Sequence, residues 1–138
     1  MRKRTQAREF AMQILYSMDV TRDDCALCLD NFWQGHPDED IESSIKEFTA
    51  VIVRGVAVNL AALDEKISQY ATNWQLSRMA VVDRNILRMG TFELIFCPDI
   101  PPKVSINEAV DLAKRYSGPE AGKFVNAILD KVKQELKK

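Results

Sequence analysis

The sequence has few of the features that secreted, membrane-spanning and catalytic proteins usually carry. Its three cysteines and one histidine are too few for a disulfide framework or an evident Ser–His–acid set. No apolar run approaches the ~18 residues of a membrane span, and charged residues, not an apolar signal segment, follow Met1. Phosphate-binding glycine loops are also missing. We therefore expect a cytoplasmic protein that crosses no membrane, needs no cofactor and is not an enzyme.

A lone CxxC motif, from Cys25 to Cys28, is the one pattern that could bind a metal or exchange disulfides. A structural zinc site takes four ligands, and only His36 and the distant Cys97 could complete it. A thioredoxin-like role would need a βαβ context, which the sequence does not show. We expect no bound metal and interpret both cysteines as small helix residues.

Hydrophobic periodicity favours an all-α fold. No segment alternates apolar and polar residues as a strand does, whereas apolar residues recur at spacings of three and four over most of the chain. The expected helices cover residues 5–18, 24–34, 41–70, 82–96, 105–117 and 119–136. The third is long for a globular helix and is expected to break or kink at Gly55 or Asn59. Residues 1–138 are thus predicted to form a single domain, a bundle of about seven helices.

Polar and small residues predict how several helices start and pack. Asp23 or Asp24 can cap the second helix, because a side-chain oxygen there accepts from a free amide. The acids between Asp38 and Glu42 would lie on the first turn of the third helix, where the helix dipole favours them. Gly90, inside a helix, predicts close contact with another helix.

The last two helices have the clearest boundary signals. Ser105 and Glu108 have the spacing of a capping box, which predicts a helix start at Ser105. Gly118 would end that helix, and Pro119 would occupy the first turn of the next one.

Charge is unevenly distributed, although the net charge is only −1. Residues 19–47 hold nine acidic side chains against two basic ones, and basic residues are in excess over the rest of the chain. Basic side chains gather where the first helix begins: Arg2, Lys3, Arg4 and Arg8. Cations at a helix start oppose the helix dipole, so they suggest a polyanionic partner, although charged helix faces are often simply solvated.

Aromatic residues extend this interpretation. Tyr16 falls nearly opposite the apolar stripe of the first helix. Phe124 lies roughly 90° from the apolar stripe of the last helix and shares that flank with Lys131, whereas Lys123 lies nearly opposite the stripe. An aromatic ring beside cations suits single-stranded RNA, because the ring stacks on a base while the cations hold phosphates. Packing of Phe124 under a neighbouring loop is the alternative.

Several motifs occur in an order and at a spacing that resemble the NusB family of bacterial transcription antitermination factors. They are Arg2 to Glu9, Gln13 to Tyr16, Asn73 to Met79, Val82 to Gly90, Val104 to Val110 and Gly122 to Asp130. The resemblance covers nearly the whole chain and is least diagnostic over residues 20–45. It implies the helical NusB fold and a non-enzymatic adaptor that binds boxA-type single-stranded RNA of ribosomal RNA operon transcripts with the ribosomal protein acting as NusE. The complex would help RNA polymerase pass terminators.

The resemblance also implies site residues. The RNA site would contain Arg2, Lys3, Arg4, Arg8, Lys123 and Phe124, to which we add the aromatic Tyr16. The contact with NusE would involve Arg78, Met79, Asp83 and Arg84. Gly122 stands just before the Lys-Phe pair and offers no side-chain contact there.

Two other functions stay open at this point. A NusB-like domain also begins some ribosomal RNA cytosine methyltransferases. The methyl-donor domain has no room before Lys138, so this alternative applies only if the chain is a fragment. A protein-interaction module, such as a homodimer that hides the basic site, is the other alternative.

Overall fold

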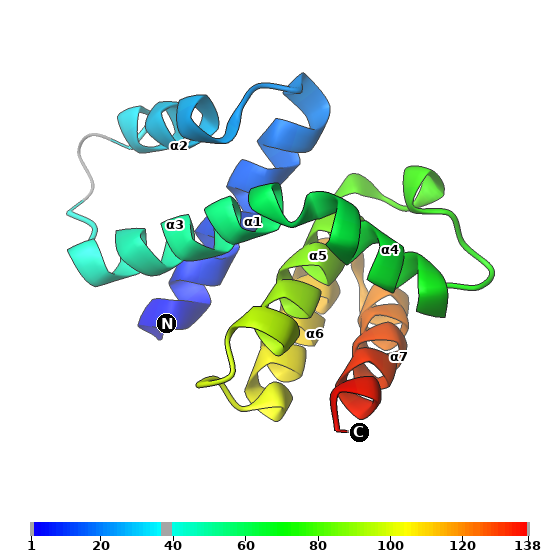
Figure 1. Cartoon of the computed structure of the whole chain (residues 1–138). Coiled ribbons are helices and arrows are strands. Elements are labelled where there is room, and N and C mark those ends of the chain that lie inside the picture. The colour runs from blue at the N-terminus through cyan, green and yellow to red at the C-terminus, as the bar shows by residue number, and fades with distance from the viewer. Residues whose placement is uncertain (1, 37–39, 138) are drawn as a thin grey trace.

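The computed structural model describes residues 2–36 and 40–137, and over these residues the chain is all-α, as predicted (Figure 1). Seven α-helices and one short 3-10 helix, η1, occur within those ranges. They are α1 (Lys3–Thr21), α2 (Cys25–Gln34), α3 (Ser43–Val58), α4 (Leu60–Tyr70), η1 (Leu76–Arg78), α5 (Val81–Phe96), α6 (Pro102–Ser117) and α7 (Pro119–Leu136).

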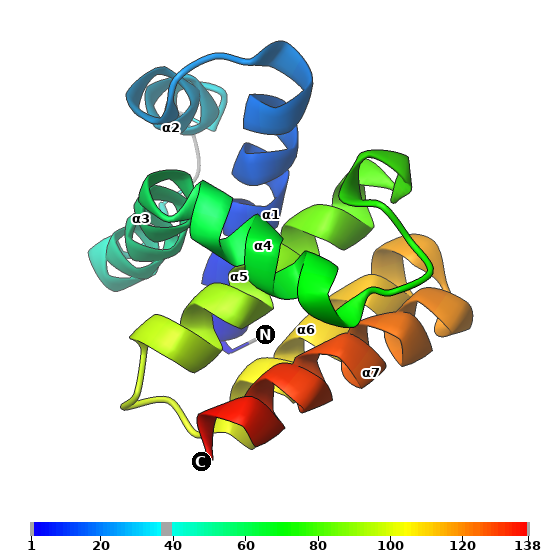
Figure 2. The ribbon, with the colours of Figure 1, turned by 45° about the vertical axis from the view of Figure 1, so that its right-hand side comes forward.

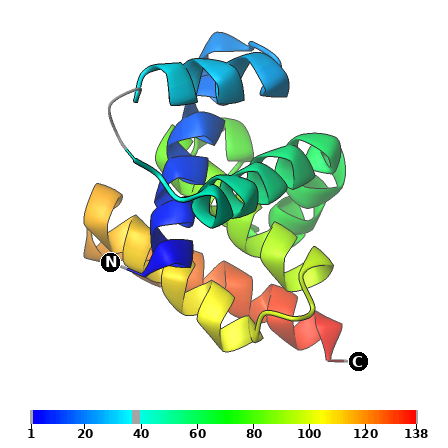
Figure 3. The ribbon, with the colours of Figure 1, turned by 90° about the vertical axis from the view of Figure 1, so that its left-hand side faces the viewer.

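Helix α5 is the centre of the bundle, because it packs against α1, α3, α4, α6 and α7. Figure 2 shows α1, α2 and α3 on one side of it and the α6–α7 hairpin on the other. Figure 3 shows α2 at the end of the molecule remote from α6 and α7. Ile86 and Leu87 of α5 are fully buried. Because α5 contacts both halves, it also fixes their relative position.

Three predicted helix boundaries are confirmed. The carboxylate of Asp24 caps α2 by accepting from the Leu27 amide at 2.8 Å. The long apolar segment divides at Asn59, whose side-chain amide donates to the Gly55 carbonyl at 2.8 Å. Gly118, with φ at +100°, separates α6 from α7, and Pro119 is the first residue of α7.

Close helix packing explains the glycine inside α5. A Cβ at Gly90 would lie 2.6 Å from Leu129 Cδ1 of α7, which is less than any normal contact. Gly55 does not break α3; a Cβ there would collide with the ring of Phe92 on α5. Both glycines therefore allow neighbouring helices to approach α5.

Two predictions about helix starts were wrong. Helix α6 begins at Pro102, where the fixed φ of proline suits the first turn, so Ser105 lies inside the helix and forms no capping box with Glu108. Helix α3 begins at Ser43, so Asp40 and Glu42 precede its first turn. Asp38 and Glu39 lie outside the described residues. Glu42 pairs instead with Lys3 of α1 at 3.0 Å.

Candidate functional site

The N-terminal end of α1 presents three exposed cations: Arg2, which precedes the helix, and Lys3 and Arg4 on its first turn. Lys3 forms its ion pair with Glu42 at the surface, where water weakens it. The Arg4 guanidinium lies 4.3 Å from the ring centre of Phe48 on α3. These contacts hold the cations at one end of α1 without burying them, so they stay accessible to an anionic ligand.

Arg8, the fourth predicted cation, is not part of this surface. Only 3% of it is exposed, and its guanidinium donates to both carboxylate oxygens of Glu93 on α5 at 2.7 and 2.9 Å. Glu108 of α6 accepts a further bond at 3.2 Å. Burial acts to lower the pKa of Arg8, but the two carboxylates outweigh it and raise that pKa above its ordinary value. The prediction that Arg8 is free to contact RNA is corrected: it is an internal ion-pair residue.

Tyr16 is 42% exposed, which confirms its predicted place opposite the apolar stripe of α1. It lies twelve residues after Arg4, which corresponds to about 18 Å along the helix. Tyr16 therefore belongs to a different part of the surface from the N-terminal cations.

Phe124 lies in a groove between the α4–α5 connection and the start of α7. The groove has a volume of about 410 Å³, and the residues that line it include Trp74, Arg78 and Asp83. The rings of Trp74 and Phe124 meet nearly edge to face, with centres 6.2 Å apart. Phe124 is half-buried against the core, whereas Trp74 is 56% exposed. The structure thus joins a predicted RNA residue to three predicted partner residues, Arg78, Met79 and Asp83.

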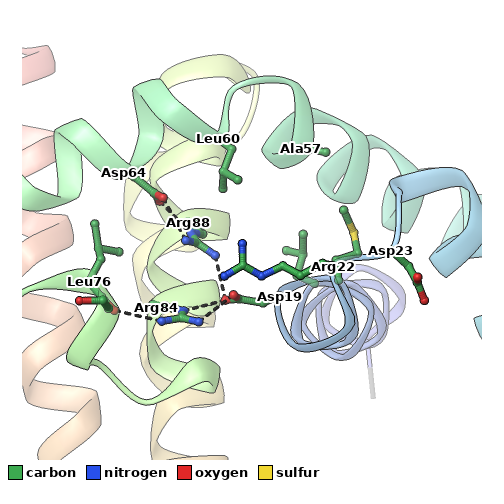
Figure 4. Close-up of a pocket in the computed structure, with 12 residues that line it drawn as sticks. Asp19, Arg22, Asp23, Ala57, Leu60, Asp64, Leu76, Arg84 and Arg88 are labelled. Carbon is green, nitrogen blue, oxygen red and sulfur yellow. Dashed lines mark hydrogen bonds and ion pairs between the residues drawn. The ribbon is translucent and has the colours of Figure 1, made fainter.

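Met79 and Arg84, which are also predicted partner residues, expose little of their side chains. Met79 is buried in the core. Arg84 donates to both oxygens of Asp19 on α1, at 2.6 and 2.7 Å, and to the Leu76 carbonyl at 3.2 Å (Figure 4). Met79 still lines the groove, and Arg84 is occupied by these internal bonds, so their contact with the protein partner stays a prediction. Arg84 links η1 to α1 and α5. It thereby also positions the α4–α5 connection, which carries Trp74.

Asp19 is the junction of a larger ionic network around this anchor. Arg88 donates to Asp19 at 3.0 Å and to both oxygens of Asp64 on α4, and Asn85 also donates to Asp19 at 3.0 Å. Burial acts to raise the pKa of Asp19, but its bonds to Arg84 and Asn85 and the nearby charge of Arg88 outweigh this and lower it.

Basic residues of α6 connect the start of α1 with the start of α7. Arg115 pairs with Glu9 of α1 at 2.8 Å. The stem of Lys114 packs on α7, where a Cβ at Gly122 would lie 2.7 Å from Lys114 Cγ. Lys123 is next to Gly122 and exposed, with a weak pair to Glu120 at 3.5 Å. Gly122 therefore provides packing space for a lysine stem.

Sequence analysis missed Trp74 and Asp19, and the local signals for these two residues are unequal. Trp74 could have been found, because a large aromatic lies there between the polar residues Asn73 and Gln75, in a segment with no helical periodicity. Nothing local indicates that Asp19 pairs with Arg84, because the two are 65 residues apart in the chain.

The CxxC motif shows no metal-site geometry. Cys25, Cys28 and Cys97 are free thiols, and the His36 ring makes its hydrogen bond to the Phe32 carbonyl at 2.7 Å. Within residues 2–36 and 40–137, no three His, Cys, Asp or Glu residues gather as metal ligands would. Over the same residues, no helix combines the length and the apolar character that crossing a bilayer requires.

Comparison with known proteins identifies the relatives of this chain. The NusB family model matches residues 5–134. The transcription antitermination protein NusB of Anaeromyxobacter dehalogenans is 46% identical over 134 residues, covering 97% of this chain and 92% of that protein. The solved NusB of T. maritima is 39% identical with a TM-score of 0.87, covering 96% of this chain and 91% of its own. A crystal structure of antitermination factors NusB and NusE with double-stranded RNA is 27% identical with a TM-score of 0.87, covering 98% of both chains.

Proposed function

The chain belongs to the NusB family, and from that premise we propose that it is a non-enzymatic adaptor in transcription antitermination. In this proposal it acts in the cytoplasm, where it binds boxA-type single-stranded RNA of ribosomal RNA operon transcripts together with the ribosomal protein acting as NusE. The complex then joins the RNA polymerase antitermination complex and helps the polymerase pass terminators. The observation that carries the proposal is the exposed cationic start of α1.

The RNA surface that we propose starts at Arg2, Lys3 and Arg4. These three side chains are exposed, and cations at a helix start do not favour the helix itself, whereas they can neutralise phosphates. From there the surface follows α6 through Arg115 and Lys114, which contact α1 and α7 respectively. It ends at Lys123 and Phe124 on α7. Arg8 supports this surface from inside and does not contact the RNA.

The protein partner is proposed to contact Arg78 and Asp83. Both lie at the groove, and the carboxylate of Asp83 carries a charge that would repel RNA phosphate. A solved relative has both NusE and RNA in its complex, which supports binding of the two partners by one molecule. A partner that adds surface and charge would raise the affinity for RNA.

The proposal is tested by the salt dependence of RNA binding. Replacing Arg2, Lys3 and Arg4 together by Ala should flatten the slope of log K against log salt by about 2.1, at ~0.7 per phosphate contact of single-stranded RNA. The control replaces the exposed Arg54, Lys103 and Lys137 by Ala, which removes the same charge elsewhere. Equal slopes for the two triple variants would contradict the proposed RNA surface.

The partner is tested with Asp83→Lys. This variant should weaken NusE binding while RNA binding by the isolated protein is unchanged or stronger, because a repulsive charge is replaced by an attractive one. Gel filtration of the protein with and without RNA reports whether formation of a homodimer competes with RNA binding. Unchanged affinity for NusE would count against the role of Asp83.

A further inference from the structure

The exposed ring of Trp74 has no role in the surface described so far. We propose that Trp74 and Phe124 together form a stacking site for one unpaired base of the bound RNA. This inference rests on the proposed function, because it assigns a specific base-binding site to the same RNA. It adds a residue from the α4–α5 connection, which the sequence motifs did not indicate as a contact with RNA.

The two rings differ in what they offer. Phe124 is half-buried and fixed against the core, so it supplies a rigid wall. The planes of the two rings are 70° apart, and the edge-to-face contact leaves much of the indole surface uncovered. With 56% of Trp74 exposed, this apolar surface faces solvent in the free protein. A base that stacks on the indole would bury it, and any base can do so because each has a π-face.

The connection that carries Trp74 is held in place from both ends. The Trp74 amide donates to the Ala71 carbonyl at 3.1 Å, and the Arg78 amide donates to the Gln75 carbonyl at 2.9 Å. Arg84 holds the Leu76 carbonyl at 3.2 Å. These bonds restrict the backbone on both sides of Trp74, so the ring is positioned before a ligand arrives and little ordering cost remains.

The charges around the groove favour a base over a phosphate inside it. Asp83 and Glu120 line the groove, and their carboxylates repel a phosphate but not the uncharged ring of a base. Arg78 is exposed at the same groove, where it can hold the phosphate of the stacked nucleotide. A nucleotide would thus enter base first, onto the exposed indole face beside Phe124, with its phosphate outside near Arg78.

The direct test measures the binding of a boxA-type single-stranded RNA oligonucleotide to the full chain, with and without NusE. Trp74→Ala should weaken RNA binding at least about fivefold, and roughly tenfold is typical for the loss of one stacked base. The slope of log K against log salt should be preserved. Trp74→Phe should keep most of the affinity because it keeps a ring. Phe96→Ala is the matched control, because Phe96 is also an exposed aromatic paired with a second ring, Phe92, but lies at the opposite end of α5.

A second measurement identifies the stacked base. Oligonucleotides with a single abasic position are titrated against the wild type and Trp74→Ala. One position should weaken binding to the wild type and have little further effect on Trp74→Ala. In a Trp33→Phe background, where Trp74 is the single tryptophan, the intact oligonucleotide should quench its fluorescence and the matching abasic one should quench it less.

The outcomes separate this inference from the proposed function. If the wild type binds no RNA, both are overturned. If it binds RNA and the folded Trp74→Ala variant binds it equally well, the base-binding site is overturned and the proposed function stands. If Trp74→Ala weakens NusE binding and leaves RNA binding intact, the groove holds an apolar side chain of the protein partner, and the base-binding site is again overturned. A circular dichroism melt of each variant confirms its folding, and Trp74→Phe provides the test if Trp74→Ala unfolds.

Discussion

Two ion clusters join α1 to α5, and they differ in how far water reaches them. At the start of α1, Arg8 pairs with Glu93, and the two side chains are 3% and 2% exposed. At the end of α1, Asp19 pairs with Arg84, and the exposures are 10% and 16%. The cation belongs to α1 in the first cluster and to α5 in the second. The second cluster also borders a cavity of about 560 Å³, which Figure 4 shows.

This difference predicts different roles for similar contacts. A buried charge whose partner is removed cannot be solvated, so the first cluster should determine whether α1 packs at all. A charge near an open cavity can be solvated when a partner is lost, so the second should determine local order more than global stability. The first lies behind the proposed RNA surface and the second holds the Trp74 connection, so each positions one functional region.

The largest effect is expected from Arg8→Ala. It leaves the buried carboxylate of Glu93 without its cation, which should lower the free energy of unfolding by about 3–5 kcal/mol. Urea denaturation followed by circular dichroism measures this change. Arg4→Ala, one turn earlier and exposed, is the matched control and should stay within about 0.5 kcal/mol. A similar small loss for both variants would show that the Arg8 cluster is not closed to water.

A double variant sharpens this test. Arg8→Met with Glu93→Leu removes both charges and should be more stable than Arg8→Ala, because no isolated charge stays buried. If the double variant is no more stable than the single one, the polar partners Ser105 and Glu108 determine the cost instead.

An intermediate effect is expected from Arg84→Ala, about 1.5–3 kcal/mol in the free energy of unfolding, which is the range for hydrogen bonds to charged groups. Asp19 would keep its bonds to Asn85 and Arg88. Amide hydrogen exchange should increase over residues 71–80 more than in the core of α5, because the Leu76 carbonyl loses its donor. Uniform faster exchange over the whole chain would contradict a local role.

The smallest effect is expected from the protonation of Asp19, which occurs only at acid pH. Its pKa in the folded protein is lowered from the ordinary 3.8. The stabilisation is therefore fully present above about pH 3.8 and is lost as the pH falls through the lower, folded-state value. Asp19→Asn should remove this part of the acid sensitivity, measured as the difference between the variant and the wild type in urea unfolding at several acid pH values. The raised pKa of Arg8 places its titration far on the alkaline side, so Arg8 itself should add no acid sensitivity.

The helices were predictable where the signal is local. Asp24 caps α2 by accepting from an amide three residues away. Gly118 and Pro119 mark the boundary between α6 and α7 through their own backbone preferences. Ser105 and Glu108 also have the local spacing of a capping box, yet that prediction was wrong. It failed because Pro102 starts α6 one turn earlier, and the buried Ser105 hydroxyl then donates to Glu93 on α5 at 2.9 Å.

Residue patterns along the chain predicted the all-α fold, a break at Gly55 or Asn59, the exposure of Tyr16 and the NusB family membership. All of these depend on residue spacing along the chain. The tertiary structure alone decided the environment of each charge and ring. Arg8 and Arg4 are both basic residues of one helix, yet Arg8 is buried because Glu93, 85 residues later, lies opposite it. Trp74 and Phe124 form a pair because α5 and α7 bring two distant segments to one groove. The energy of a charge or an aromatic ring depends on its neighbours in space, and spacing along the chain does not specify those neighbours.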